Sequence, residues 1–311
     1  MACAPVALVI ASTTTAITVC SASVAYSEQL MIKSLRKYAL IFTGPTLIAF
    51  AIAFAIPFAV GLYLSFCDFT TVTDAKFIGL DNYVRAFTER ERLWSALGFT
   101  TLVTVLSVIT VNIFAFAIAY LLTRKLRGTN FFRTIFFMPN LIGGIVLGYT
   151  WQTIINAVLV QYQTTLASQA KFGFIGLILL LNWQMIGYMM IIYIAGLQNV
   201  PGELLEAAQI DGASKWQTLR NVTIPMVMPS ITICLFLTMS SSFKLFDANL
   251  ALTNGAPMHK TEMIALNIVD TFFSRSGAEG VGQAKAMIFF VLVSLLAFFQ
   301  LRATRSQEVE S

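Results

Sequence analysis

Long apolar runs with few charged residues constrain this chain more than any other feature of its sequence. Charged residues make up 11% of the chain, compared with about 25% in an average soluble protein. A helix needs about 20 predominantly apolar residues to cross a bilayer, and the runs are of that order. We therefore predict an all-α polytopic membrane protein with about six transmembrane helices. They are expected at about residues 38–66, 96–122, 132–156, 173–197, 222–246 and 284–301.

Basic residues gather at the ends of these runs, and their positions predict the topology. If six runs alternate in direction, the basic groups before the first, after the second, after the fourth and after the sixth share one side. Short loops rich in Lys and Arg face the cytoplasm. We therefore expect cytoplasmic N- and C-termini, with residues 253–282 outside. The net charge of +5 is explained by this pattern, so no nucleic-acid partner is expected.

The residues that usually form metal or catalytic sites are sparse. His259 is the only histidine, and the cysteines form no C-x-x-C pair, which predicts neither a metal site nor a disulfide framework. No G-x-x-x-x-G-K-[ST], G-x-S-x-G or H-E-x-x-H motif is present. We therefore predict no catalytic residue and no ATP hydrolysis in this chain. Energy for transport would come from a gradient or from a partner.

The first 30 residues differ from the rest of the chain. They are rich in Ala, Val, Thr and Ser, and Glu28 is the first charged residue. A secretory signal needs a basic segment at its start, which is missing here. Basic residues lie directly after Met31, so we predict that residues 1–30 are an extension and that Met31 is the natural start. A short additional membrane helix is the alternative.

A polar segment, residues 203–225, separates the fourth and fifth runs. Helix-forming residues lie on both sides of Gly212, which permits one helix to end in a left-handed conformation and another to begin. Pro225 marks the entry to the next apolar run. A segment this polar cannot lie in hydrocarbon, so it must lie at the membrane surface. Taken alone, the pattern also fits an ordinary loop between two membrane helices.

The order of residues in this segment resembles the EAA loop of permeases in binding-protein-dependent ABC importers. The matching residues are Glu206, Ala207, Ala208, Asp211, Gly212, Ala213 and Pro225. A second segment, residues 77–83, resembles the Gly-Leu-Asn/Asp-Asn-Tyr signature of carbohydrate-importer permeases. A third, residues 252–257, is similar to the family's Leu-Thr-x-Gly-Gly-Pro, with Ala256 in place of a glycine.

This resemblance implies a type I ABC importer permease of the maltose or multiple-sugar type, in the cytoplasmic membrane of a bacterium or archaeon. In that family the EAA loop is a coupling helix that docks on a separate ATPase subunit. The implied partners are a second homologous permease subunit, two ATPase subunits, an extracytoplasmic sugar-binding protein and membrane lipid. The chain itself is expected to bind no cofactor, and the partner ATPases would use ATP and Mg. The implied domains are residues 31–92, a first helix and outer loop; 93–302, the transporter domain; and 303–311, a cytoplasmic tail.

Polar and aromatic residues within the runs are candidates for a substrate path, because amides and aromatic rings suit carbohydrate recognition. The candidates are Asn140, Trp151, Asn182, Gln184, Tyr188, Ser241 and Lys244. Such side chains also pair membrane helices with one another, and that alternative stays open for each of them. Lys244 and Asp247 are three residues apart, so we expect them to pair on one helix.

Two local patterns predict further packing. Gly144 and Gly148 form a G-x-x-x-G face that permits close helix contact. Residues 261–273 predict an amphipathic helix outside the bilayer, capped by Thr261 and buried through Ile264, Ile268 and Phe272.

Three other functions remain as alternatives. The first is a permease for glycerol phosphate or another polyol. The second is an ion-gradient carrier without an ATPase, which would be expected to show internal repeats and intramembrane acids. The third is a membrane enzyme, for which the sequence offers no reactive constellation.

Overall fold

The computed structural model describes residues 41, 43–124 and 128–305. The chain divides into two compact units, one ending at Gly61 and one beginning at Leu62. The expectations for residues 1–30 and for a start at Met31 concern residues outside the described part. The last helix runs to Arg305, and residues 306–311 of the expected tail also lie outside it.

Four helices are long and apolar enough to cross a membrane. The first covers Thr43–Leu64 and includes the π-helical turn η1 (Ala51–Ala55) and α2 (Ile56–Leu64). The other three, all in the second unit, are α4 (Leu93–Leu122), α7 (Ala170–Gln198) and α14 (Glu279–Arg305). These confirm the predicted first, second, fourth and sixth membrane helices, and with them the all-α membrane class.

The predicted third and fifth helices are each present as a pair of helices that meet at a bend, which the apolar pattern did not predict. The third consists of α5 (Thr129–Phe137), η3 (Met138–Leu141), α6 (Gly144–Leu159) and η4 (Val160–Tyr162), bent by 101°. Pro139 lacks the backbone N–H that continues a helix, and Ile142 is extended at ψ 130°.

The fifth consists of α9 (Lys215–Thr218), η5 (Leu219–Thr223), α10 (Ile224–Met226) and α11 (Met228–Phe243), bent by 71°. Pro225 and Pro229 lie on either side of this bend. Each proline removes one helical hydrogen bond, so the helix changes direction between them.

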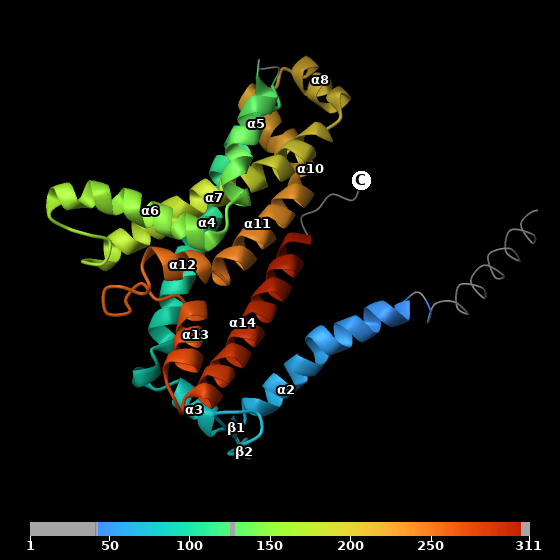
Figure 1. The fold of residues 1–311 in the computed structure, drawn as a ribbon. Helices are drawn as coiled ribbons and strands as arrows, with labels where there is room; N and C mark the ends of the chain where they lie inside the picture. Colours follow the sequence, from blue (N-terminus) through green and yellow to red (C-terminus); the bar gives the residue numbers. More distant parts are fainter. Residues whose placement is uncertain (1–40, 42, 125–127, 306–311) are drawn as a thin grey trace, which may run out of the picture. The chain divides into compact units, whose positions relative to one another are not determined.

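The core of the second unit lies where α4, α7 and α11 cross (Figure 1). Tyr193, Met189 and Cys234 are buried there among leucine and valine side chains. Two glycines permit the closest approaches of α7. A Cβ on Gly187 would clash with the backbone carbonyl of Phe136 in α5, and one on Gly196 would clash with Ser230 in α11.

The bend at Pro139 turns α6 so that it packs on α12 (Asp247–Leu252). A Cβ on Gly144 would lie 2.9 Å from Cβ of Asp247, and one on Gly148 would lie 2.5 Å from Cβ of Ala251. The predicted close contact through G-x-x-x-G is therefore confirmed.

A small antiparallel hairpin precedes α4. Strands β1 (Cys67–Asp68) and β2 (Lys76–Phe77) pair Cys67 with Phe77, and α3 (Asp81–Ala86) and η2 (Glu89–Glu91) come next along the chain. Asp74 closes the hairpin loop. Its carboxylate accepts hydrogen bonds from the Thr70 side chain and from two backbone N–H groups, which lower the pKa of Asp74 to about 2.

The predicted amphipathic helix is present as α13 (Ile264–Ser274), and Ile264 is fully buried against α4 and α14. Its predicted start and cap were wrong. Met263 is the N-cap residue, and the Thr261 hydroxyl donates to the Ala256 carbonyl at 2.6 Å, where it holds the preceding loop instead.

Candidate functional site

The polar segment forms an elbow of two helices, α8 (Gly202–Ile210) and α9, joined through Gly212. Gly212 has φ +76°, a left-handed conformation that favours glycine. Ala213 N–H donates to the Ala208 carbonyl at 2.9 Å, which ends α8, and a capping box between Ser214 and Gln217 begins α9. The predicted helix–Gly–helix geometry is confirmed. A Cβ at Gly212 would meet no atom within 4 Å, so backbone conformation alone requires the glycine.

Most side chains of the elbow are exposed on the surface of the chain. No residue of α8 is buried, and Glu206 and Ala207 are exposed. Ile210 is 86% exposed and Trp216 is 67% exposed. Large apolar side chains beside exposed carboxylates on a short helix are typical of a surface that docks on another protein.

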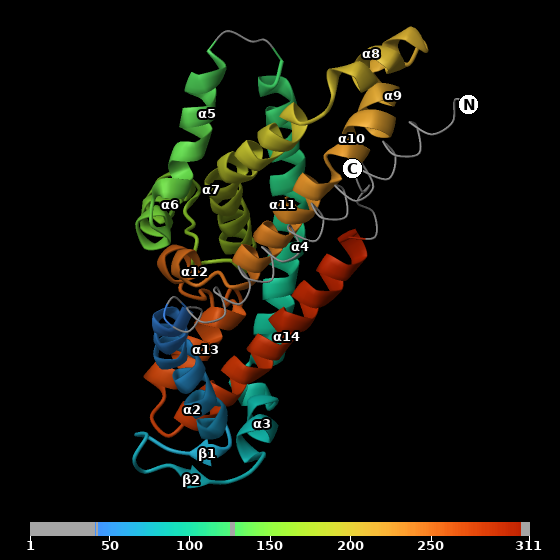
Figure 2. The same ribbon diagram turned by 90° about the vertical axis from the view of Figure 1, so that its right-hand side faces the viewer.

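The elbow lies at the end of the second unit where α4 and α7 finish, and the hairpin and α3 lie at the opposite end (Figure 2). Behind the elbow is a cavity of about 670 Å³, whose lining includes Arg124, Gln209 and Lys215. Pro225 lies in α10, where the elbow rejoins the core through the bend before α11. The elbow is therefore joined to α11 through this bend.

Three predicted path residues come together in a second, smaller cavity of about 250 Å³. Gln184, Ser241 and Lys244 line it, together with Phe246 and Asp247. It lies where α11 ends, α12 begins and α6 starts after its bend. Amide, hydroxyl, ammonium and carboxylate groups here offer both donors and acceptors, which is the set that a polyhydroxyl compound requires.

The other predicted path residues do not line this cavity. The Trp151 ring lies edge-on to that of Trp183, with centroids 5.6 Å apart. Asn182 donates to the Thr110 hydroxyl at 2.9 Å and so joins α7 to α4, as in the helix-pairing alternative. Asn140 is half-buried in η3, and Tyr188 is 38% exposed. Roles for these four in a substrate path stay predictions.

Lys244 and Asp247 form none of the ion pairs found within the described part of the chain. Our expectation that they pair on one helix was wrong, because α11 ends at Phe243 and α12 begins at Asp247. Both side chains are exposed and line the 250 Å³ cavity. Their charges are therefore available to a bound molecule.

A buried ionic cluster at the opposite end from the elbow was missed in the sequence. Lys285 of α14 is fully buried, and its ammonium lies 2.9 Å from a carboxylate oxygen of Glu91. It also donates to Asn267 Oδ1 at 2.9 Å, to Thr271 Oγ1 at 2.7 Å and to the Glu91 carbonyl at 2.9 Å. In the sequence, the position of Lys285 at the edge of an apolar run is a signal that could have indicated this cluster.

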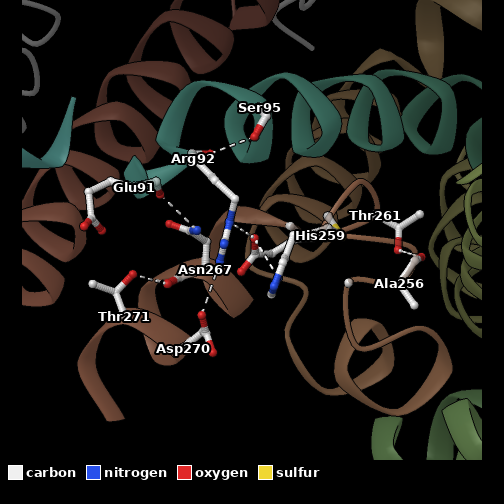
Figure 3. A network of polar contacts seen from close by, with 12 residues as sticks. Glu91, Arg92, Ser95, Ala256, His259, Thr261, Asn267, Asp270 and Thr271 are labelled. Atoms are coloured by element: carbon white, nitrogen blue, oxygen red, sulfur yellow. Dashed lines mark hydrogen bonds and ion pairs between the residues drawn. The ribbon is translucent and has the colours of Figure 1, made fainter. Parts of the chain in front are cut away.

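Arg92 and Arg275 extend this cluster toward the surface, and Figure 3 shows Arg92 reaching toward Asp270. Arg92 binds Glu262 at 3.1 Å and Asp270 at 3.4 Å, and Arg275 binds Glu91 at 3.1 Å and Asp270 at 3.5 Å. His259 lies 3.4 Å from Glu262. The cluster joins the start of α4, the loop before α13, α13 itself and α14, so it holds that loop and α13 to the two long helices.

The sequence matches known families along most of its length. The model of the binding-protein-dependent transport system inner membrane component family matches residues 127–307. The chain is 42% identical to the probable starch degradation products transport system permease protein AmyD of Thermoanaerobacterium thermosulfurigenes, over 87% of this chain and 94% of that protein. It is 30% identical to the trehalose transport system permease protein SugA of Mycobacterium tuberculosis, over 85% of this chain and 87% of that protein.

A solved structure shares the fold. It is a bacterial ABC transporter involved in the import of the acidic polysaccharide alginate, with a TM-score of 0.75 and 20% identity over 89% of this chain and 98% of that chain. The family inferred from the Glu-Ala-Ala elbow is thus confirmed by sequence, and the type I importer fold by structure. This chain belongs to the inner membrane components of binding-protein-dependent transport systems.

Proposed function

We propose that this chain is a permease subunit of an ATP-driven ABC importer that moves a sugar across the cytoplasmic membrane. The observation that carries the proposal is the exposed elbow, in which the Glu-Ala-Ala helix and left-handed Gly212 stand at the end of the membrane helices. An ion-gradient carrier needs no helix that docks on an ATPase. A membrane enzyme would need a cluster of catalytic side chains.

The proposed substrate is a mono- or oligosaccharide. Relatives carry names that refer to starch degradation products, multiple sugars and trehalose. The mixed donors and acceptors of the 250 Å³ cavity suit a neutral polyol, and the opposite charges of Lys244 and Asp247 give it no excess of either sign. A phosphorylated polyol would favour a cavity with an excess of cations, which this cavity does not have. Glycerol phosphate is therefore only the second candidate substrate.

We infer the remaining subunits from membership of this family. α8 would dock on a separate ATPase, with Glu206 in polar contact, and that ATPase would use ATP and Mg. A second homologous permease and a second ATPase would complete the membrane complex, and an extracytoplasmic binding protein would deliver the sugar. A solved neighbour in the comparison was captured with a periplasmic protein bound to an alginate pentasaccharide. Both termini and the elbow would face the cytoplasm.

The test is uptake by cells that lack this gene. Loss of labelled malto-oligosaccharide or trehalose uptake, restored by the gene and abolished when ATP is depleted, is the expected result. Loss confined to glycerol 3-phosphate would select the polyol permease instead. Uptake that survives ATP depletion but stops when an ionophore collapses the ion gradient would overturn the proposal.

A further inference from the structure

Helix α3 presents three different surfaces around its axis. Successive helical residues turn by about 100°, so the residues from 80 to 87 fall into three sectors. One is buried, through Asn82 and Ala86. The second is charged and exposed. The third is apolar but exposed, with Leu80 at 64%, Val84 at 67% and Phe87 at 44%. A helix that needed only to cover its own chain would not carry this third sector.

The buried sector fixes α3 firmly on the second unit. The Asn82 amide donates to the carbonyls of Ser65 and Cys67 at 3.1 and 2.7 Å. The Tyr83 hydroxyl lies 2.7 Å from that of Ser65. A Cβ on Gly280 of α14 would lie 2.6 Å from the Asn82 nitrogen, so α3 packs directly on that glycine. The outward direction of the apolar sector is therefore set by tight contacts on its far side.

The apolar sector continues onto a membrane helix. The Phe87 ring lies 5.5 Å from that of Trp94, which is 66% exposed at the start of α4. Trp94, Leu97 and Val105 then line an apolar groove of about 590 Å³ along α4. Tryptophan is enriched where membrane helices leave the hydrocarbon. Exposed apolar side chains thus continue from the groove along α4, through the contact between Trp94 and Phe87, onto α3.

We propose that α3 is an interfacial helix that lies in the lipid headgroup region at the end where α4 and α14 begin. Leu80, Val84 and Phe87 enter the lipid, and the charged sector of Asp81 and Arg85 faces water. Lipid is favoured over a docked protein because the exposed sector merges with the flank of α4 instead of facing away from the membrane. The inference depends on neither the transported substrate nor the ATPase.

The test compares nitroxide labels on adjacent residues, Val84→Cys and Arg85→Cys, in liposomes of phosphatidylcholine and phosphatidylglycerol. Accessibility to oxygen and to a water-soluble nickel complex is measured by power saturation. The protein without an added cysteine gives the background. The Val84 label is expected about 5–10 Å inside the headgroup boundary, with oxygen access exceeding nickel access. The Arg85 label is expected to be open to nickel.

Three results would overturn the inference. Equal nickel access at both positions would place α3 in water. A Val84 label shielded from both reagents would place α3 against protein. A Val84 label that is open to nickel until an extracytoplasmic protein is added would make this surface a docking site for that protein. Monodisperse elution of both labelled variants verifies that neither substitution has unfolded the chain.

Discussion

Lys285 is a cation enclosed by protein at the end of a membrane helix, and its environment explains how that is tolerated. Removal of an ammonium from water is costly unless it is paired and hydrogen-bonded. Lys285 has an ion pair with Glu91 and hydrogen bonds to Asn267 and Thr271. Glu91 precedes α4, and Asn267 and Thr271 both lie in α13, so this one side chain of α14 joins three segments.

Lys285→Met should destabilise the protein by about 3–5 kcal/mol, since it leaves polar groups buried without their partner. The measurement is thermal unfolding of the purified chain in detergent. Lys260→Met is the control, because Lys260 is exposed and forms none of the described ion pairs. Equal unfolding temperatures for the two variants would mean that the cluster does not hold α13 and its preceding loop in place.

Gln184 and Asn182 differ by two positions but are expected to act differently. Gln184 lines the 250 Å³ cavity and donates only a long hydrogen bond, 3.5 Å, to the Ile142 carbonyl. Gln184→Ala should raise the transport KM about 3- to 10-fold, because it removes roughly one hydrogen bond to the substrate. Assembly of the variant should be normal.

Asn182→Ala is the matched comparison. It removes the hydrogen bond from Asn182 to Thr110 and should cost about 0.5–2 kcal/mol of stability without a change in KM. Transport kinetics in proteoliposomes and unfolding of the same preparations separate the two effects. A reversed pattern would remove Gln184 from the substrate path.

At the scale of elements, the structure differs from the sequence-based prediction in the bends of two membrane helices. Apolar length predicted six spans, and four are continuous, but Pro139 and Pro229 break the other two. Prolines are tolerated in membrane helices, so their presence alone did not predict bends of 101° and 71°. The elbow was predictable because its glycine and polar residues act locally. The ionic cluster was not, because its members meet only through tertiary packing.

The contact between α5 and α7 should tolerate no side chain at Gly187. Gly187→Ala would place a Cβ against the Phe136 carbonyl, and backbone cannot move aside as a flexible side chain can. We expect a markedly lower yield of folded protein, measured by monodisperse recovery in mild detergent. Gly98→Ala in α4 is the control, since its Cβ would meet nothing within 4 Å. Equal recovery would show that α5 is not held against α7.

The elbow should transmit the conformational change driven by ATP hydrolysis from the ATPase to the membrane helices, and it should contribute little to the stability of the fold. Glu206→Lys reverses an exposed charge, and Gly212→Asp requires a left-handed conformation at a cost of roughly 1 kcal/mol. Both variants should insert normally and remain with the partner permease, but uptake should be abolished, because a docked helix tolerates displacements of only about an ångström. Copurification of the ATPase and ATPase activity in proteoliposomes are the measurements.

Glu203→Lys provides a control on the same helix, since Glu203 is exposed in the first turn of α8 but lies outside the Glu-Ala-Ala pattern. It should retain more coupling than Glu206→Lys. Normal substrate-stimulated ATP hydrolysis in the Glu206 and Gly212 variants would show that the elbow is only a connecting loop.

At the scale of the whole molecule, function requires the two ends of the second unit to face different compartments. The elbow lies at one end, and the hairpin, α3 and the ionic cluster lie at the other (Figures 1 and 2). From the distribution of basic residues we expect the elbow end to face the cytoplasm. In that orientation an ATPase could reach α8, and α13 and its preceding loop would face the compartment from which a binding protein would deliver substrate.

This orientation is tested by single cysteines at opposite ends. Ser274 is exposed at the end of α13, and Trp216 is 67% exposed in the elbow. The unsubstituted chain is labelled in parallel to measure the reaction of the native cysteines, of which Cys67 and Cys234 are buried. In spheroplasts, Ser274→Cys should react with an impermeant maleimide, and Trp216→Cys should react only after the membrane is opened. The reverse pattern would place the elbow outside the cell, away from cytoplasmic ATP, and the proposed importer would have to be abandoned.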